Sequence, residues 1–333
     1  MDLLTQFFST LYANFTNLNS RLAVLYLCCT VLIVAVLWIV RGRPKTFTEY
    51  LLPKDVYLHK SNLVDIKLFF FNTLVRFGGF LTLVAVTPVV AASVIERLSE
   101  WTQTTPSEAA PTFWLMALAT VIIILTNDFC TYWVHRIHHE AKVLWPFHSV
   151  HHSAEVMTPL TVYRKHPIYD LLNQAFKSCI VGAVQGVMLF AVVGEISVLT
   201  IGTANLGYVI FNFLGANLRH SHIWLSYGPL LEHVLISPAQ HQIHHSVDHK
   251  HYNKNYGEVF AIWDLMFGTL YVPQSLETLQ FGLSDKTGNR IEQPHPTLRA
   301  ALIVPFVDCW QTLWKGTSRD ARAKHRPKVS TTL

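Results

Sequence analysis

The sequence predicts an all-α integral membrane protein with about four to five transmembrane helices and a cytoplasmic helical cap that carries histidine clusters. Of the 333 residues, 51% are hydrophobic and only 14% are charged, whereas about 25% are charged in a typical soluble domain. Several long apolar runs contain no charged residue, and most histidines lie in the segments between and after these runs. This composition argues against a disordered chain, and five cysteines are too few for a disulfide scaffold.

The first predicted span covers residues 22–40. About 20 apolar residues are needed to cross a hydrocarbon core of roughly 30 Å. The run contains no charged residue, and Arg41, Arg43 and Lys45 follow it. We interpret it as a membrane anchor and not as a signal peptide, because no small-residue cleavage site follows.

Three further apolar runs predict the remaining spans. Residues 78–95 and 112–127 predict the second and third spans. Residues 177–216 form a longer apolar stretch with a break near Gly194 and Glu195. This stretch predicts a hairpin of two spans, and a re-entrant pair of helices would give the same sidedness.

Charges in the loops predict the orientation of these spans. Residues 41–67 hold six lysines and arginines, whereas residues 96–111 hold one arginine and three glutamates. Positive loops face the cytoplasm, so residues 128–176 and those after about 217 are also expected there. The net charge of +5 comes largely from the C-terminal region. A basic tail on an apolar body fits an anionic membrane surface better than nucleic acid.

Fifteen of the 18 histidines lie between residues 135 and 251, and three clusters repeat the spacing H-x-x-H-H. Positions i, i+3 and i+4 of a helix share one face, with Cβ atoms about 5–6 Å apart, so two imidazoles can converge on one metal ion. Residues 112–140 would form a helix of roughly 43 Å that carries the third span on to the first cluster. Ser237 and Pro238 predict the start of a helix at the third cluster. The clusters are His135, His138 and His139; His148, His151 and His152; and His241, His244 and His245.

The number of imidazoles predicts two metal ions. The clusters offer nine rings, and His220, at the predicted cytoplasmic end of the hairpin, is a natural tenth. A catalytic zinc ion takes three protein ligands, so nine or ten nitrogens suit two ions with four or five imidazoles each. The sequence has no C-x-x-C motif, and imidazole ligands alone would suit zinc, copper, iron or nickel.

Further motifs surround the clusters. They are Asp128–Arg136 (DFCTYWVHR), Arg164–Pro167 (RKHP), Asn255–Gly257 (NYG), Trp263–Asp264 and Phe267–Thr269 (FGT). Together with the boxes HxxxH (His135–His139), HxxHH (His148–His152) and HxxHH (His241–His245), residues 115–272 resemble the membrane fatty-acid hydroxylase/sterol desaturase superfamily.

This resemblance implies a membrane enzyme with two non-haem iron ions, which uses O₂ and two electrons to hydroxylate a lipid. A high-valent metal is needed to attack an alkyl C–H bond, and zinc cannot become one. The predicted metal ligands are His135, His139, His148, His151, His152, His220, His241, His244 and His245.

Five other residues are predicted either as additional ligands or as groups that contact the ligands. Histidine ligands usually donate their other N–H to a carboxylate or carbonyl, and Asp128, seven residues before His135, is the best candidate for this role. His138 is extra to the HxxxH box, and His222 stands where relatives often have asparagine. The remaining two are His166 and His251, for which a plain structural role is the alternative.

The electron donor is expected to be a separate protein, such as a cytochrome-b-type protein, a ferredoxin or a reductase. The sequence contains no G-x-G-x-x-G motif, no C-x-x-C-H motif and no ferredoxin cysteine set. The lipid is expected to enter sideways from the bilayer, and a sterol, fatty acyl chain, glycerol ether or amino-lipid all remain possible substrates. The membrane is expected to be a bacterial inner membrane or the endoplasmic reticulum.

Two alternative functions remain open. A desaturase could use the same site. A protein that stores or transports metal is an alternative of another class, but it would need ionisable residues inside its spans, and residues 22–40, 78–95 and 112–127 contain none. We divide the chain into an N-terminal transmembrane anchor region (1–111), a catalytic domain (112–275) and a cytoplasmic C-terminal segment (276–333), whose last residues, 316–333, are expected to be disordered.

Overall fold

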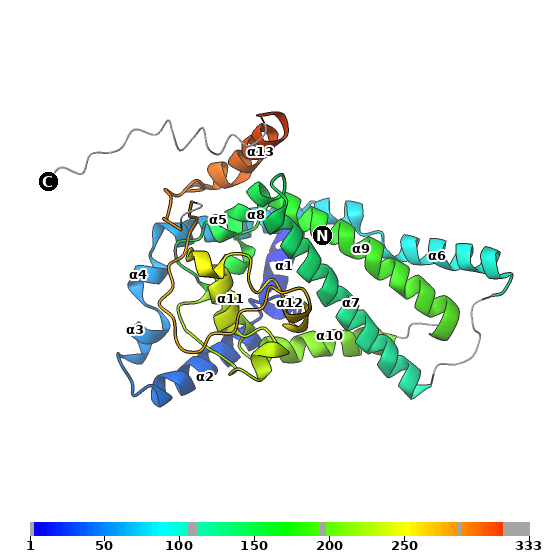
Figure 1. The fold of residues 1–333 in the computed structure, drawn as a ribbon, viewed down its shortest axis with the longest axis horizontal. Helices are drawn as coiled ribbons and strands as arrows, with labels where there is room; N and C mark the ends of the chain where they lie inside the picture. Colours follow the sequence, from blue (N-terminus) through cyan, green and yellow to red (C-terminus); the bar gives the residue numbers. More distant parts are fainter. Residues whose placement is uncertain (1–2, 106–111, 194–197, 286–287, 316–333) are drawn as a thin grey trace.

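The structure is a computed structural model, which describes residues 3–105, 112–193, 198–285 and 288–315. In this part of the chain every regular element is a helix, and β-pairing is limited to isolated bridges. Long helices extend to one side of a rounded head, which is built from shorter helices and loops (Figure 1). The predicted all-α fold is confirmed.

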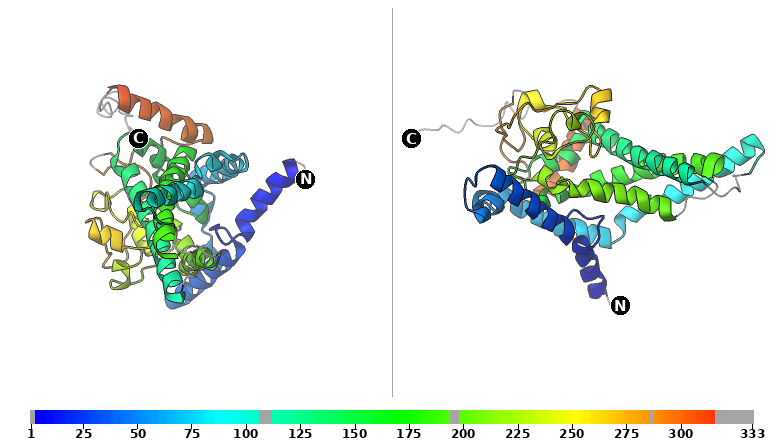
Figure 2. Two further views of the ribbon diagram at one scale, coloured as in Figure 1. Left: turned by 90° about the vertical axis from the view of Figure 1, so that its right-hand side faces the viewer. Right: turned by 90° about the horizontal axis from the view of Figure 1, so that it is seen from below.

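The N-terminal segment, residues 3–77, forms five helices beside the head. Its helices are α1 (Leu3–Thr16), α2 (Val24–Val40), α3 (Phe47–Leu51), α4 (Lys54–Tyr57) and α5 (Lys60–Phe77). Figure 2 shows that α1 projects away from the bundle, close to the place where the bundle joins the head.

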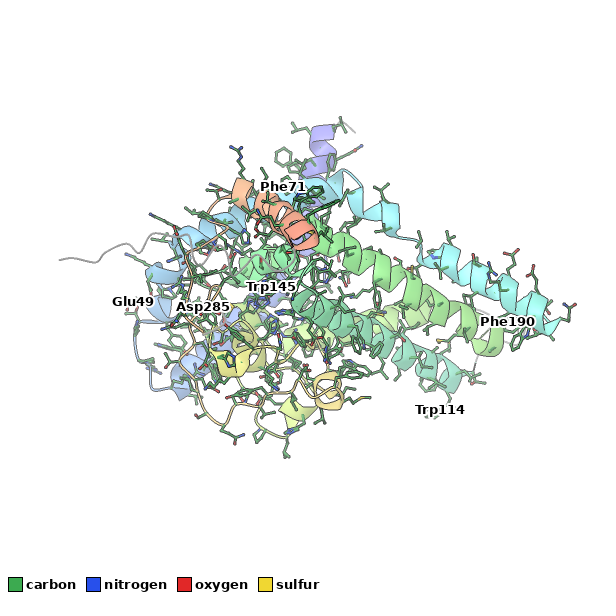
Figure 3. All side chains as sticks on the ribbon, turned by 45° about the horizontal axis from the view of Figure 1, so that its top comes forward. Glu49, Phe71, Trp114, Trp145, Phe190 and Asp285 are labelled. Carbon is green, nitrogen blue, oxygen red and sulfur yellow. The ribbon has the colours of Figure 1, made fainter. Side chains whose placement is uncertain are left out.

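The bundle consists of the longest helices. They are α6 (Thr87–Thr102), preceded by the short helix η1 (Phe80–Val84); α7 (Phe113–Glu140); α9 (Pro167–Met188), extended by the π-turn η3 (Leu189–Val193); and α10 (Val198–Phe213). In Figure 3, Trp114 and Phe190 lie at the end of the bundle that is far from the head, whereas Trp145 lies where α7 reaches the head.

The head contains the remaining elements. They are α8 (Trp145–His152), η2 (Pro159–Tyr163), η4 (Ala216–His220), η5 (Leu231–His233), α11 (Pro238–His244), η6 (His249–His251), α12 (Ile262–Met266) and α13 (Leu298–Lys315). A buried cluster of Val64, Leu68, Val150 and Ala301 joins α5, α8 and α13. The helix that carries the second histidine cluster is therefore fixed from two sides.

Within the described residues, three helices are long and apolar enough to cross a membrane: Phe80–Thr102, Phe113–Glu140 and Pro167–Ala191. The helix Val24–Val40 is apolar but shorter. These helices agree with a membrane protein. The predicted start of α7 is confirmed, because the Thr112 side chain accepts a hydrogen bond from the backbone N–H of Leu115.

Two predicted spans have different bounds in the structure. The second was expected at residues 78–95; the apolar helical stretch begins near there, at Phe80, but extends to Thr102, and its main helix α6 begins at Thr87. The fourth was expected to begin at 177, but α9 begins ten residues earlier. The reason is a local start signal, since Pro167 follows the cap residue His166, whose ring accepts the N–H of Ile168. The expected bend near Gly194 and Glu195 lies outside the described residues.

Helices α6 and α9 approach each other closely along a stripe of two glycines. A Cβ atom placed on Gly182 would lie 2.7 Å from the carbonyl oxygen of Thr87, and one placed on Gly186 would lie 2.7 Å from that of Ala91. Small residues four positions apart let membrane helices pack backbone to backbone. The glycines therefore set the distance between these two helices.

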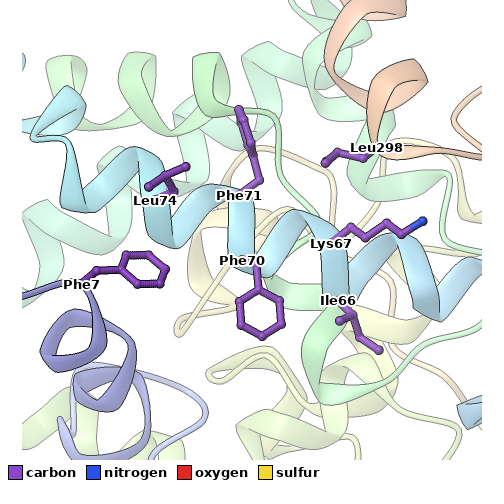
Figure 4. Close-up of a pocket in the computed structure, with 7 residues that line it drawn as sticks. All are labelled: Phe7, Ile66, Lys67, Phe70, Phe71, Leu74 and Leu298. Atoms are coloured by element: carbon purple, nitrogen blue, oxygen red, sulfur yellow. The ribbon is translucent and has the colours of Figure 1, made fainter. Parts of the chain in front are cut away.

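An apolar groove lies on the outside of the head and has a volume of about 410 Å³. It is lined by Phe7 of α1, Leu298 of α13 and one face of α5, with Lys67 as its single charged residue (Figure 4). None of the predicted metal ligands lines this groove. It is therefore distinct from the histidine site.

Candidate metal centre

Nine histidine side chains meet inside the head in two adjacent groups. Within each group, one nitrogen from every ring lies within 4.8 Å of the others. The five-histidine set consists of His135, His139, His148, His152 and His244, and the four-histidine set consists of His151, His220, His241 and His245. These are the nine residues that the sequence predicts as ligands.

The local helices explain how each ring reaches its set. His135 and His139 lie four residues apart on one face near the end of α7, and both point into the five-histidine set. In α8, His148 and His152 join the same set, whereas His151 faces the four-histidine set.

Helix α11 also divides its rings between the two sets. His244 joins the five-histidine set, while His241 and His245 join the other set. Its predicted start is confirmed, because Ser237 and Gln240 form a capping box in which each side chain accepts a hydrogen bond from the other residue's backbone N–H.

The distances between ring nitrogens fit two bound metal ions. His220 Nε2 lies 3.2 Å from His151 Nε2 and 3.0 Å from His241 Nε2. In the other set, His148 Nε2 lies 3.2 Å from His152 Nε2. Two nitrogens bound to one ion at about 2.0–2.1 Å, at tetrahedral or right angles, would lie roughly 2.8–3.4 Å apart. Each set therefore has the size of a single metal site.

Backbone carbonyls determine which nitrogen faces the site. His135 Nδ1 lies 2.7 Å from the carbonyl oxygen of Tyr256, and His244 Nδ1 lies 2.8 Å from that of Lys254. A carbonyl can only accept, so each Nδ1 carries the proton and each Nε2 has a free lone pair. The Nε2 atoms of His139 and His244 are buried and have no hydrogen-bond partner. An unpaired buried nitrogen is costly, and a metal ion would pair it.

The electrostatic environment keeps these rings neutral. Burial lowers the pKa of the four-histidine rings and of His148 and His152 well below the usual value, and neighbouring histidines lower it further. Burial also lowers the pKa of His244 to about 4. A metal ligand must be unprotonated. The rings are therefore ready to bind metal at neutral pH.

The comparison with known proteins places this region in a family. Residues 120–269, which include every histidine of the two sets, match the family described as fatty acid hydroxylase. This part of the chain is similar to the fatty acid hydroxylase family.

The similar proteins are named for activities on different lipids. An alkylglycerol monooxygenase of Xenopus tropicalis is 27% identical over 63% of this chain and 40% of its own length. An ornithine lipid hydroxylase of Rhizobium tropici is 28% identical over 53% of this chain and 49% of its own length. A Delta(7)-sterol 5(6)-desaturase of Gibberella zeae is 26% identical over 54% of this chain and 52% of its own length. The chain thus spans about half or less of the length of these relatives. No solved structure matches it.

The other four histidines that we considered lie outside both histidine sets. His166 Nε2 donates to the carbonyl of Leu302, and His222 Nε2 donates to that of Tyr50. His251 Nε2 lies 3.2 Å from the carboxylate of Glu277. His138 Nδ1 donates to a carbonyl of its own helix, and its ring packs against Tyr169, at 4.6 Å between centroids. The contacts of these four histidines stabilise the fold, and none of the four belongs to either histidine set.

Asp128 does not contact a histidine ligand in the way that we expected. Its carboxylate accepts hydrogen bonds from the backbone N–H groups of Val259 and Phe260 and from the indole N–H of Trp263. Three donors from residues 259–263 thus engage both oxygens. Asp128 therefore holds the loop that follows the third box against α7.

Sequence reasoning missed how the protein orients the rings. The acceptors of His135 and His244 are backbone carbonyls, which leave no side-chain signal. The NYG motif indicates the loop concerned, and Asp264 fixes this loop by accepting from the N–H groups of Tyr256 and Gly257. Asp264 thus acts on the ligand His135 through the backbone of Tyr256, whose N–H donates to Asp264 and whose carbonyl accepts from His135.

Proposed function

We propose that this protein is a multi-pass membrane oxygenase that holds two iron ions in the five- and four-histidine sets and hydroxylates a lipid. Its similarity to the fatty acid hydroxylase family, to lipid monooxygenases and to sterol desaturases supports an oxidoreductase. The observation that carries the proposal is the division of nine imidazoles into two adjacent sets, each of the size of one metal site.

Iron suits both the donors and the reaction. Neutral imidazoles bind zinc, copper, iron and nickel, but the oxidation of an alkyl C–H bond needs a metal that changes its oxidation state. When bound, two iron ions would supply O₂ activation together with the electrons from a donor. The residues of the chain hold the ions, keep the ligand rings neutral and exclude bulk water from the sets.

The geometry supports access for a lipid from the membrane. His135 and His139 lie at the end of α7, a helix that is able to cross a membrane, so the sets lie at the head-side end of the bundle. We place the head on the cytoplasmic side, because the basic segment 41–67 leads into it. An external cytochrome-b-type protein, ferredoxin or reductase would deliver electrons there.

The same scheme assigns a role to each region. Residues 1–111 anchor the protein, residues 112–275 form the catalytic domain, and residues 276–333 form a C-terminal segment. The N-terminal region also supports the catalytic domain, since Asp65 pairs with Arg164 at 2.8 Å.

Isotope labelling tests this function and separates it from desaturation. Membranes that contain the protein would be incubated under ¹⁸O₂ with a reductase system and a panel of lipids. Hydroxylation places one ¹⁸O atom in the product, whereas an unlabelled alkene would mean desaturation, the activity named for the Gibberella zeae relative. Metal bound without any O₂ consumption would favour a protein that stores or transports metal.

A further inference from the structure

A second group of polar side chains lies beside the four-histidine set and takes no part in metal binding. Arg21, in the turn before α2, donates to Glu258 Oε1 at 3.1 Å and to the Tyr208 hydroxyl at 3.3 Å. Its other nitrogen, Nη1, donates to the carbonyl of Ala216, at the start of the η4 turn that ends in the ligand His220. Arg21 thus connects the N-terminal segment to the metal site.

Several polar atoms around this ion pair have no partner among the described residues. Both amide atoms of Asn212 are buried and unpaired, as is Nε of Arg219. Asn212 follows Tyr208 by four residues on α10, so both side chains lie on the same helix face. The Arg219 guanidinium is 2% exposed and lies 4.5 Å from the ring centroid of Phe211, the residue before Asn212.

The charges of this group are retained at neutral pH. Burial alone would raise the pKa of Glu258, but the Arg21, Lys177 and Lys165 cations lower it to about 2. Glu258 is thus a carboxylate, and a third of its side-chain surface remains accessible. A ligand can therefore reach the Glu258 carboxylate.

The unpaired atoms indicate which kind of chemical group would pair with them. Asn212 Nδ2 and Arg219 Nε are donors, whereas Asn212 Oδ1 and Glu258 Oε2 are acceptors, and no hydrogen bond to Glu258 Oε2 occurs among the described residues. A hydrocarbon chain would leave all four atoms unpaired. A simple anion would pair the donors but would face the Glu258 carboxylate. Only a group that both donates and accepts, such as a hydroxyl or an amide, pairs all four.

We propose that Arg21, Tyr208, Asn212, Arg219 and Glu258 bind the polar end of the lipid substrate, and that this end carries hydroxyl or amide groups. The inference rests on the proposed function and narrows its substrate class. Because the group adjoins the η4 turn with His220, the carbon to be oxidised would lie near the polar end of the lipid and not near its terminal methyl group.

Binding of two matched probes tests the inference without turnover. The full-length, iron-loaded protein in detergent would be titrated with 1-palmitoylglycerol and with methyl palmitate, which share the acyl chain but differ in their hydroxyl groups. Affinity would be followed by the shift in unfolding temperature. We expect 1-palmitoylglycerol to bind at least about tenfold tighter than methyl palmitate. Methyl palmitate lacks the hydroxyl groups and would leave the polar groups of the site unpaired, which typically lowers affinity by this amount or more. Equal affinity of the two probes, or tighter binding of free palmitate than of 1-palmitoylglycerol, would overturn the inference.

A variant identifies the residues responsible. Asn212→Leu keeps the branched arrangement of four side-chain heavy atoms but removes both unpaired amide atoms, so it should reduce the preference to less than about threefold and leave the affinity for methyl palmitate unchanged. The control Thr131→Val removes a hydroxyl on α7 that bonds its own helix, and it should keep the full preference. The affinities of the unmodified protein for the two probes test the inference even if Asn212→Leu does not fold. Oxidation of methyl palmitate with no preference between the probes would reject this inference alone, whereas an iron-free, inactive protein would reject the proposed function.

Discussion

At the scale of single residues, histidines with the same spacing have different roles because their ring nitrogens have different partners. His244 has Nδ1 tied to a carbonyl and a free Nε2 that faces four other rings. His222 lies two residues from the ligand His220, but its Nε2 donates to the carbonyl of Tyr50. The spacing of histidines in the sequence can indicate that a ring is able to reach a metal site. The direction of its free nitrogen lone pair then decides whether the ring can bind the metal.

This difference predicts the outcome of two alanine substitutions. His148→Ala removes a ring from the five-histidine set and should lower lipid oxidation by more than about 100-fold, since even groups that only support metal ligands cost 10–100-fold when removed. His222→Ala serves as the control, and it should retain activity within about threefold. Product formation per milligram of membrane protein, normalised to the amount of chain, measures both. Equal losses in the two variants would show that the division into sets has no functional meaning.

At the scale of elements, a buried ion pair fastens the helix that carries three of the ligands. Arg164, of the RKHP motif, is completely buried and donates to the carbonyl of Val150 in α8, to Asp65 of α5 and to Ser153. The motif was visible in the sequence. Its partner Asp65 was not, because it is distant in the chain and lies in no motif.

Removal of one member of this pair should be strongly destabilising. Arg164→Met leaves the Asp65 carboxylate buried without a counter-charge, which typically costs about 3–5 kcal/mol in the free energy of unfolding. The double variant Asp65→Leu/Arg164→Met removes both charges and should recover a large part of the loss. Thermal unfolding in detergent measures all three proteins. If the double variant is as unstable as the single one, the unpaired charge is not the cause.

The packing of α6 against α9 gives a second prediction at this scale. In Gly186→Ala, the new methyl group would meet the Ala91 carbonyl oxygen at 2.7 Å and Val94 Cβ at 2.8 Å. Overpacking of this kind costs about 1–3 kcal/mol, so the unfolding temperature should fall. Gly78→Ala is the matched control, because its methyl group would meet only ordinary contacts of 3.5 Å or more. An unchanged unfolding temperature in Gly186→Ala would contradict the close approach of the two helices.

The sequence predicted those elements whose signals are local. The cap of α11 at Ser237 depends on residues within one turn and was predicted correctly, and the start of α7 near residue 112 was predicted correctly from the apolar run. The start of α9 was placed too late, because hydropathy alone locates the apolar run and not the cap at His166. The division of the rings into two sets and the contacts of Asp128 depend on tertiary packing. The spacing of residues in the sequence does not reveal such packing.

At the scale of the whole molecule, burial of many neutral imidazoles makes stability depend on pH. The seven ligand rings outside α7 have lowered pKa values in the folded protein, about 4 for His244. In the unfolded chain they titrate near 6.5. Below that pH the unfolded state binds more protons than the folded state, so acid favours unfolding.

The metal-free protein should therefore lose stability as the pH falls from about 6.5 toward 4. Each ring contributes up to about 1.4 kcal/mol per pH unit to the free energy of unfolding. Bound metal competes with protons for the same nitrogens, so the loaded protein should resist acid down to a lower pH. Unfolding temperatures measured at pH 7.5, 6 and 5, with and without metal, test this. A metal-free protein that is equally stable at pH 7.5 and 5 would contradict the prediction.

The most direct test of the whole account is the number of iron ions per chain. The protein would be purified from cells supplied with iron, and its metal content would be determined by mass spectrometry against the amount of chain from amino-acid analysis. Two adjacent sets of five and four imidazoles predict close to two iron ions per chain. One ion or none, in a folded protein whose lipid oxidation is intact, would contradict the account.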